Sequence, residues 1–237
     1  PRPPCARPTG PAHKAVPLPR AAALFLLPLP SKSAHAAYRT LARVVQHAWL
    51  AASAALLERH TRIVVDVDGV PPARDDDYVV IICNHHSRID WMYLWCVAAR
   101  RGWLPRLKIV LKDSLKRVPF FGWAMQAFLF VFVSRSDREG DIGTLSATLR
   151  YYTAIGERAH VLIFPEGTDL SPSNVRKSQA FAASRSLPRW SRVLRPRVGG
   201  FAASVRALRP RLDAVYDATI SYLPHELDVA AGERPAR

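Results

Sequence analysis

Short apolar, β-branched runs alternate along the chain with longer segments whose apolar positions recur at helical spacing. Trp91–Arg100, which is apolar on all sides, and Asp141–Ile155 are predicted to be helices. The runs predicted to be strands are Ile63–Val67, Tyr78–Cys83, Lys108–Leu111, Phe128–Val133, Val161–Phe164, Val193–Leu194 and Ala214–Ile220. This alternation predicts an α/β fold with a mixed, largely parallel sheet flanked by helices.

The part of the chain before this alternation has a different composition. Leu41–Leu57 is mostly Ala, Val and Leu, and at about 1.5 Å per residue it falls short of a ~30 Å hydrocarbon core. It is either a buried amphipathic core helix or a helix lying in one leaflet of a membrane, and the sequence leaves both open. Ala21–Leu29 is too short to span a bilayer. The predicted divisions are a disordered, basic, proline-rich arm (1–19), membrane-associating helices (20–58), one folded domain (59–225) and a disordered tail (226–237).

Composition and charge narrow the classes of function. The chain has 237 residues, 49% of them hydrophobic, so it is not a disordered polyelectrolyte. Three cysteines are too few and too scattered for a disulfide framework or a zinc site, so no metal is expected. With 34 Lys and Arg against 19 Asp and Glu, the net charge is +15. The expected partners are therefore anionic: nucleic acid, phosphorylated metabolites or a membrane surface.

The segment after the predicted strand Tyr78–Cys83 carries two histidines and a carboxylate. A histidine beside an aspartate is the minimal general-base pair, because the carboxylate orients the imidazole that takes the proton. Spacing leaves two candidates: His86 and Asp90 meet on a continuous helix, whereas His85 and Asp90 meet only if the helix begins after the histidines. Ser87 and Asp90 form a capping-box pattern that predicts Ser87 as the N-cap. Alternatively, Asp90 only caps the helix.

Two further strands each end in a polar residue that could serve a ligand. After Val161–Phe164, a proline stops strand pairing and Gly167 permits a tight turn, which would present Glu166 as an acceptor for a substrate hydroxyl. Arg135 follows a second apolar strand, and its guanidinium could fork onto a phosphate. A later basic turn, Leu194–Gly200, could bind anions through its side chains or backbone.

Taken in this order, the four segments resemble the boxes of the glycerolipid acyltransferase family, of the lysophosphatidic acid acyltransferase type. The similarity is closest to the lysocardiolipin acyltransferase branch and extends from about Ala42 to Pro224. The stretches that carry it are Asn84–Met92, Leu111–Lys112 with Ser114–Lys116, Val118–Pro119 with Phe121–Ala127, and Phe164–Leu170. One departure from the general family pattern is that the second box reads Phe-Val-Ser-Arg, without a leading glycine, as in the lysocardiolipin branch.

The resemblance implies a role for each matching position. His85, the histidine after Asn84, would be the catalytic base, and Asp90 would orient it. Arg135 would contact the acceptor phosphate, and Glu166 with Gly167 would hold its glycerol portion. The substrate-binding positions that the resemblance implies are Asn84, Arg135, Glu166, Gly167, Thr168 and Pro196.

The implied reaction is direct acyl transfer, in which His85 deprotonates a lysophospholipid hydroxyl that attacks the thioester of an acyl-CoA. Acyl-CoA would be a co-substrate, with no permanently bound cofactor, no metal and no obligate protein partner. The expected location is the endoplasmic reticulum membrane, with mitochondria-associated membrane as the alternative. Shorter ends than those of the branch leave the membrane topology open.

Two other classes of function compete with this one. The charge alone suggests a basic nucleic-acid-binding module, but the aromatic residues that could stack on bases lie in apolar runs. These aromatic residues are Trp91, Trp95, Trp123, Phe128 and Phe130. A catalytically inactive membrane-binding relative is opposed by the intact candidate site. Because seven cations precede Glu58, the first acidic residue, the charge distribution favours a membrane lipid over nucleic acid.

Overall fold

A five-stranded parallel sheet forms the centre of the protein. The computed structural model describes residues 32–61, 65, 67–69 and 78–222. The strands are β1 (Tyr78–Cys83), β2 (Leu107–Lys112), β3 (Val131–Val133), β4 (Ala159–Ile163) and β5 (Ala214–Ala218), in the order β3-β2-β4-β1-β5. In the register, Ile81 of β1 lies between Leu162 of β4 and Tyr216 of β5. All four pairings among the described strands are parallel, which corrects the expectation of a mixed sheet.

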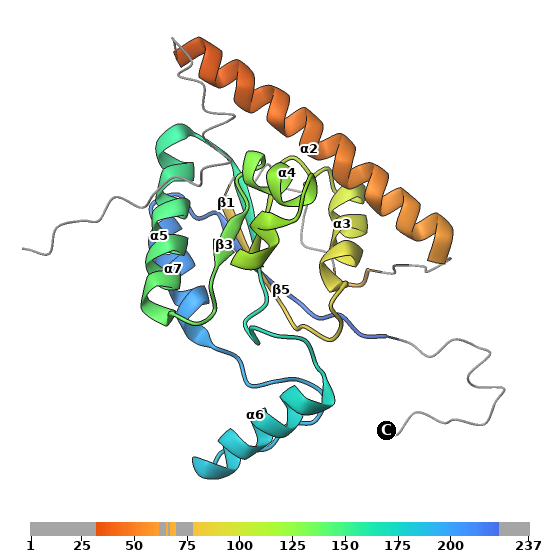
Figure 1. Ribbon diagram of the computed structural model, residues 1–237, viewed down its shortest axis with the longest axis vertical. Helices are drawn as coiled ribbons and strands as arrows, with labels where there is room; N and C mark the ends of the chain where they lie inside the picture. The colour runs from red at the N-terminus through yellow and green to blue at the C-terminus, as the bar shows by residue number, and fades with distance from the viewer. Residues whose placement is uncertain (1–31, 62–64, 66, 70–77, 223–237) are drawn as a thin grey trace, which may run out of the picture.

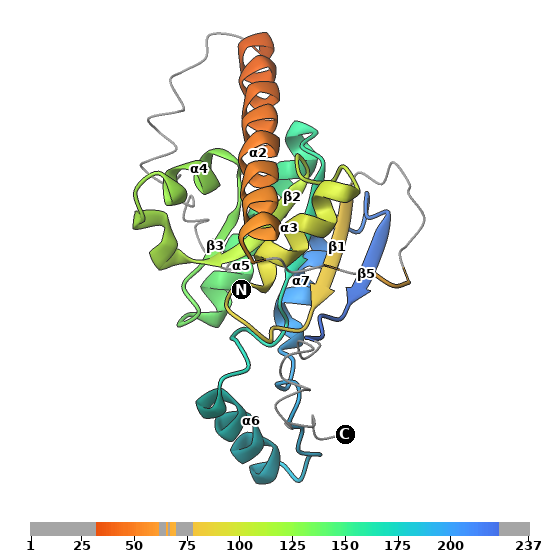
Figure 2. The ribbon, with the colours of Figure 1, turned by 90° about the vertical axis from the view of Figure 1, so that its right-hand side faces the viewer.

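Helices cover both faces of this sheet, as Figures 1 and 2 show. They are α2 (Lys32–Thr61), α3 (Asp90–Arg100), α4 (Phe121–Ala127), α5 (Arg138–Ile155), α6 (Pro172–Ser184) and α7 (Val198–Leu208), with a short 3₁₀ turn η1 (Asp113–Arg117). Buried residues of α2, α3 and α4 pack on one face, and those of α5 and α7 pack on the other. Alternate strand positions supply the two cores: Val79 and Ile81 face the first, whereas Tyr78 and Val80 face the second. Helix α6 projects away from both layers (Figure 1).

Most of the predicted strands are confirmed, and the exceptions have local causes. Only the end of Phe128–Val133 is a strand, because Phe128 caps α4 and Leu129 adopts a positive φ of 60°. The prediction of a strand at Val193–Leu194 is wrong: the Leu194 N–H donates to the carboxylate of Glu166. Most of the run Ile63–Val67 lies outside the described residues.

Helix α2 contains the whole of the predicted helical segment Leu41–Leu57 and is 30 residues long. Leu50 and Ala54 are buried against the core, whereas Leu41 and Val44 remain 61% and 60% exposed. One face of the helix therefore belongs to the core and the other bears uncovered apolar side chains. Within the described ranges, no helix is long and apolar enough to cross a membrane. The segments 1–19, Ala21–Leu29 and 226–237 lie outside the described residues, so their predicted properties stay predictions.

Candidate active site

The candidate residues gather at the carboxyl edge of the sheet. Because all described strands are parallel, the chain leaves β1, β3, β4 and β5 at the same edge. β1 and β4 are neighbours, so the segments that follow them meet: Glu166 Oε1 accepts a hydrogen bond from the backbone N–H of His85 at 3.1 Å. Two boxes that are 81 residues apart in the chain are thus joined directly.

His85 and Asp90 form the pair that a general base requires. The distance from His85 Nδ1 to Asp90 Oδ2 is 3.0 Å, and Asp90 is fully buried. The imidazole stacks on the ring of Phe164, with centroids 4.2 Å apart. His86 points elsewhere, and its ring lies 4.8 Å from that of Tyr222. The structure therefore selects His85 from the two histidines that spacing left open.

Electrostatics favour an ionised Asp90. Burial raises the pKa of Asp90, but hydrogen bonds from His85, Tyr222 and the Ser87 backbone outweigh it, so the pKa lies below its ordinary value. An ionised carboxylate can only accept hydrogen bonds. His85 therefore donates through Nδ1–H, which leaves its Nε2 as the nitrogen able to take a proton.

The start of α3 differs from the prediction. The helix begins at Asp90 with Ile89 as its N-cap, so the assignment of Ser87 as N-cap is wrong by two residues. One half of the capping box is present, because the Asp90 carboxylate accepts from the Ser87 N–H at 2.9 Å. The reciprocal bond is replaced by others: the N–H of Asp90 donates to the backbone carbonyl of Ser87 at 3.2 Å, and the hydroxyl of Ser87 accepts from the N–H of Ile89 at 3.5 Å. A helix that begins after the histidines allows His85 to reach a carboxylate five positions away.

Asn84 ties the loop that carries His85 to the segment after β5. Its side-chain amide donates to the carbonyl of Ile220 at 2.9 Å, and its Oδ1 accepts from the Ile220 N–H at 2.7 Å. Both polar ends of Asn84 are thus engaged by the backbone of one residue. This gives Asn84 a role in holding the loop, and its contact with substrate stays a prediction.

Glu166 connects three of the four predicted boxes. It is only 6% exposed, and its two oxygens accept from the backbone N–H groups of His85 and Leu194, at 3.1 and 3.0 Å. Burial raises its pKa above the ordinary value, and these two hydrogen bonds partly oppose the change. The carboxylate thus positions the backbone beside the His85–Asp90 pair. Its predicted contact with a substrate hydroxyl stays a prediction.

Two arginines flank the turn at Gly167. The carbonyl of Gly167 accepts from Arg135 Nη1 at 3.0 Å, and a Cβ placed on this glycine would lie 3.7 Å from Arg197 Cδ. Gly167 has φ +74°, and Arg135 also adopts a positive φ of 67°. The backbone N–H of Arg135 donates to Asp141 at 2.7 Å, which supports this turn. The arrangement collects positive charge close to the His85 loop.

The remaining predicted residues lie around the same turn. Thr168 Oγ1 accepts from the side-chain amide of Asn174 at 3.0 Å, near the start of α6. Pro196 precedes Arg197, whose N–H donates to the carbonyl of Pro165 at 2.7 Å. The fourth box is thereby linked to the Pro165–Thr168 turn, although the chain runs through α6 between them.

Tyr222 is the site residue that sequence reasoning missed. Its hydroxyl donates to Asp90 Oδ1 across 132 positions of the chain. A signal was present, because Tyr222 follows the predicted strand Ala214–Ile220 and polar residues after parallel strands share one edge.

Cys83, the last residue of β1, lies near the same edge. Burial raises the pKa of the Cys83 thiol to about 12, so it is not a ready nucleophile. Among the described residues, no three His, Cys, Asp or Glu side chains are arranged to hold a metal ion.

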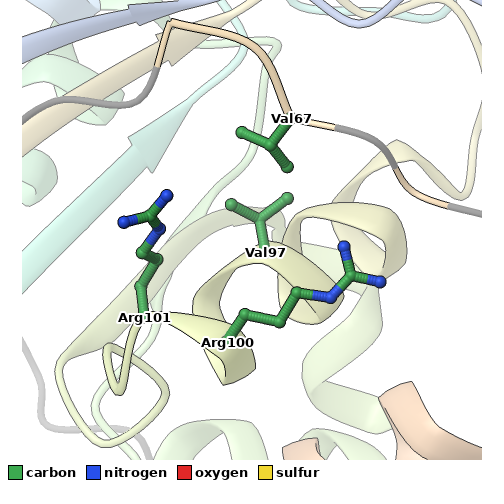
Figure 3. A pocket seen from close by; sticks show the side chains of 4 residues that line it. All are labelled: Val67, Val97, Arg100 and Arg101. Carbon is green, nitrogen blue, oxygen red and sulfur yellow. The ribbon is translucent and has the colours of Figure 1, made fainter.

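A small hollow of about 300 Å³ lies at the opposite end of α3 from Asp90 (Figure 3). It is lined by Val67, Val97, Arg100 and Arg101. The Arg100 guanidinium is already engaged, since it donates to Glu58 at 2.7 Å and to the carbonyl of Val65. Because the hollow lies at the C-terminal end of α3 and Asp90 at its start, the hollow is separate from the His85–Asp90 pair.

The fold and the site together define an α/β protein with a His–Asp pair at the carboxyl edge of a parallel sheet. Residues 64–222 match the family model described as Acyltransferase, and the chain belongs to this family. The resemblance found in the sequence is thus confirmed.

Named relatives agree with this assignment. Lysocardiolipin acyltransferase 1 of Danio rerio is 42% identical over 189 residues, covering 78% of this chain and 48% of that protein. Probable 1-acyl-sn-glycerol-3-phosphate acyltransferase 5 of Arabidopsis thaliana is 38% identical, covering 79% and 50%. Lysophosphatidylinositol acyltransferase 10 of Caenorhabditis elegans is 34% identical, covering 84% and 51%. The chain thus spans about half the length of these relatives. No solved structure was found to match it.

Proposed function

We propose that this chain catalyses acyl-CoA-dependent re-acylation of a lysophospholipid, with His85 as general base. The observation that carries the proposal is the 3.0 Å contact between His85 Nδ1 and the buried Asp90 carboxylate. Such a pair holds the imidazole in one tautomer and orientation, which leaves Nε2 available to a substrate hydroxyl.

The reaction then proceeds by direct transfer. Nε2 of His85 takes the proton of a glycerol hydroxyl as its oxygen attacks the thioester carbonyl of acyl-CoA. The carbon–sulfur bond breaks, the imidazolium returns its proton to the departing thiolate, and the products are the acylated phospholipid and free coenzyme A. General-base catalysis is typically worth about 10²–10⁴-fold, so holding the two substrates together must supply much of the remaining acceleration.

The arginines beside Gly167 support an acceptor that carries phosphate. Arg135 and Arg197 lie on the two sides of this turn. Burial and the neighbouring Arg197 charge lower the pKa of Arg135, and the charges of Asp141 and Asp169 partly oppose the change. A phosphate between them would relieve that repulsion and accept charge-assisted hydrogen bonds. The turn is linked through Glu166 to His85, so a bound phosphate would hold its glycerol near the base.

The relatives' names support the class of acceptor. They refer to lysocardiolipin, 1-acylglycerol 3-phosphate and lysophosphatidylinositol, all of which combine a glycerol hydroxyl with a phosphate. We extend this class to the present chain and propose a lysophospholipid acceptor.

A membrane surface is the proposed setting for the reaction. The outer face of α2 exposes large apolar side chains, and Leu41, Val44 and Leu56 are each at least 57% exposed. Exposed apolar side chains of this kind can insert into the interface of a membrane. The net charge of +15 would attract the protein to anionic lipids. We place the protein at the endoplasmic reticulum membrane, with mitochondria-associated membrane as the alternative.

His85→Ala tests this proposal, and His86→Ala is its matched control on the adjacent residue. Purified variants would be assayed with labelled oleoyl-CoA and a panel of lysophosphatidic acid, lysophosphatidylinositol, lysophosphatidylglycerol and monolysocardiolipin. We expect His85→Ala to lose at least about 10²-fold in kcat/KM while His86→Ala keeps most of its activity. Full activity in the first variant, or loss confined to the second, would overturn the role given to His85.

A further inference from the structure

The segment after β5 is fixed directly against the loop that carries His85. The two hydrogen bonds between Asn84 and the backbone of Ile220, at 2.9 and 2.7 Å, act as a clamp between the two segments. Tyr222 comes two residues after this clamp. Its ring lies 4.8 Å from that of His86 and 5.9 Å from that of Tyr93. The side chain is thus held over the start of α3, where Asp90 is buried.

Tyr222 completes the hydrogen bonding of Asp90. Oδ2 of the carboxylate faces both His85 Nδ1, at 3.0 Å, and the Ser87 N–H, at 2.9 Å. Oδ1 accepts from the hydroxyl of Tyr222. Because Asp90 is fully buried, an Oδ1 that lost this donor would be a buried, unsatisfied anionic oxygen.

We propose that Tyr222 is a positioning residue of the site, whose hydroxyl holds the Asp90 carboxylate so that its Oδ2 stays directed at His85. The inference rests on the proposed function of the His85–Asp90 pair. The hydroxyl of Tyr222 is engaged with the Asp90 carboxylate and also interacts with the Ser87 side chain, and its ring faces His86.

The hydroxyl also controls how strongly Asp90 attracts the imidazole proton. The titratable groups that face Asp90 from the surrounding elements are Cys83, His85, Tyr93, Glu166 and Tyr222. Of these, His85 and Tyr222 donate hydrogen bonds to its carboxylate. Removing the hydroxyl of Tyr222 leaves more negative charge on the Asp90 carboxylate. The carboxylate then stabilises the protonated imidazole of His85 more strongly. The acid limb of the kcat/KM profile should therefore move to higher pH.

The kinetic test compares Tyr222→Phe with Tyr93→Phe. Each variant removes one hydroxyl and keeps its ring, but the hydroxyl of Tyr93 makes no hydrogen bond to Asp90. We expect Tyr222→Phe to lower kcat about tenfold with little change in KM, as for the loss of one hydrogen bond to a charged group. Its acid limb should shift to higher pH, whereas the profile of Tyr93→Phe should match the parent protein.

A spectroscopic test does not depend on the substrate. In protein labelled with ¹⁵N-histidine, the Nδ1–H proton of His85 should appear far downfield and be absent from His85→Ala. We expect Tyr222→Phe to move this signal further downfield. Incorporating 3-fluorotyrosine at position 222, which keeps the hydroxyl and strengthens it as a donor, should move the signal upfield, and Tyr93→Phe should leave it in place. The fluorinated protein keeps the test decisive if Tyr222→Phe fails to fold.

The results separate this inference from the proposed function. A Tyr222→Phe protein with parent activity, parent pH profile and an unmoved Nδ1–H signal would overturn the role of Tyr222 even if His85→Ala is inactive. Full activity in His85→Ala would instead overturn the proposed function, whereas the proton signal would still report whether Tyr222 controls the geometry of Asp90.

Discussion

Two buried carboxylates lie at opposite edges of the sheet, and the first is surrounded by cations. Glu157 lies two residues before the start of β4 and is 1% exposed. It pairs with Arg39 at 2.9 Å, Arg43 at 3.1 Å and Lys108 at 3.1 Å. Burial raises the pKa of Glu157, but the charges of Lys108 and Arg39 outweigh it and hold the pKa below its ordinary value.

Asp90, at the carboxyl edge, has partners of another kind. Its donors are an imidazole, a phenol and a backbone N–H, from His85, Tyr222 and Ser87. No lysine or arginine contributes to the lowering of its pKa. Hydrogen bonds therefore do at Asp90 what ion pairs do at Glu157.

The difference shows how one type of side chain serves two purposes in one fold. At Glu157, cations from α2 and β2 keep the carboxylate ionised and bind α2 to the rest of the protein. At Asp90, hydrogen bonds from His85, Tyr222 and the Ser87 backbone keep the carboxylate ionised. A buried ion cluster stabilises a position, whereas a buried His–Asp pair can take part in proton transfer.

The cluster around Glu157 also engages the uncharged groups near it. Lys108 Nζ donates to Gln46 Oε1 at 3.0 Å and to the carbonyl of Phe128 at 2.9 Å. The Gln46 amide in turn donates to the carbonyls of Leu104 and Leu107. Burial lowers the pKa of Lys108 to about 8, although Glu157 opposes this. Because its donors have partners, the lysine is tolerated within the core.

Removing the charge of Asp90 should give the largest effect and should appear in catalysis. Asp90→Asn keeps the size of the side chain, but its amide favours the wrong tautomer of His85. We expect kcat to fall by about 10³–10⁴-fold, with a small change in melting temperature. A variant whose kcat stays within tenfold of the parent would show that the imidazole does not need this carboxylate.

Removing the charge of Glu157 should appear in stability instead. Glu157→Gln leaves Arg39, Arg43 and Lys108 uncompensated, so we expect the free energy of unfolding to fall by about 3–5 kcal/mol. The kcat of the folded protein should change little. Urea denaturation and steady-state kinetics on the same samples measure the two quantities.

Lys108→Met is the matched control within this cluster. Glu157 would keep both arginines and methionine adds no charge to bury, but Gln46 Oε1 and the Phe128 carbonyl lose a donor, so we expect a loss of about 1–3 kcal/mol, smaller than that of Glu157→Gln. If Lys108→Met costs as much as Glu157→Gln, the lysine and not the carboxylate is the centre of the cluster.

The sequence was sufficient for the features that depend on local patterns. Tyr78–Cys83 and Lys108–Leu111 are β-branched or apolar runs, and they form β1 and β2 almost as predicted. Parallel strands bring their carboxyl ends to one edge, but the pairing of β1 with β4, which sets Glu166 beside His85, is known only from the structure. The choice of His85 over His86 was open from spacing and required the start of α3.

Contacts between distant segments were beyond sequence reasoning. Tyr222 reaches Asp90 across 132 positions, and Arg39 reaches Glu157 across 118. The position of Tyr222 after a predicted strand indicates the edge on which it lies but not its partner. Val193–Leu194 has the composition of a strand, but the Leu194 N–H binds Glu166. Tertiary hydrogen bonding thus overrides local propensity there.

The smallest expected effect is a difference between Glu157 and Asp90 in how much stability each contributes as the pH falls. The pKa of Glu157 in the folded protein lies below the ordinary value of 4.5, so the unfolded chain binds more protons as the pH falls through this range. The stability due to its ionised form is thus complete above pH 4.5 and is lost progressively below it. The pKa of Asp90 in the folded protein is also lowered, so its contribution to stability is likewise lost at acid pH. In urea titrations from about pH 5 down to about pH 2, we expect Glu157→Gln to flatten the decline in stability more than Asp90→Asn does, because three cations face Glu157 and one imidazole faces Asp90. Equal slopes in the two variants would mean that the cations at Glu157 hold its charge no more firmly than His85 holds that of Asp90.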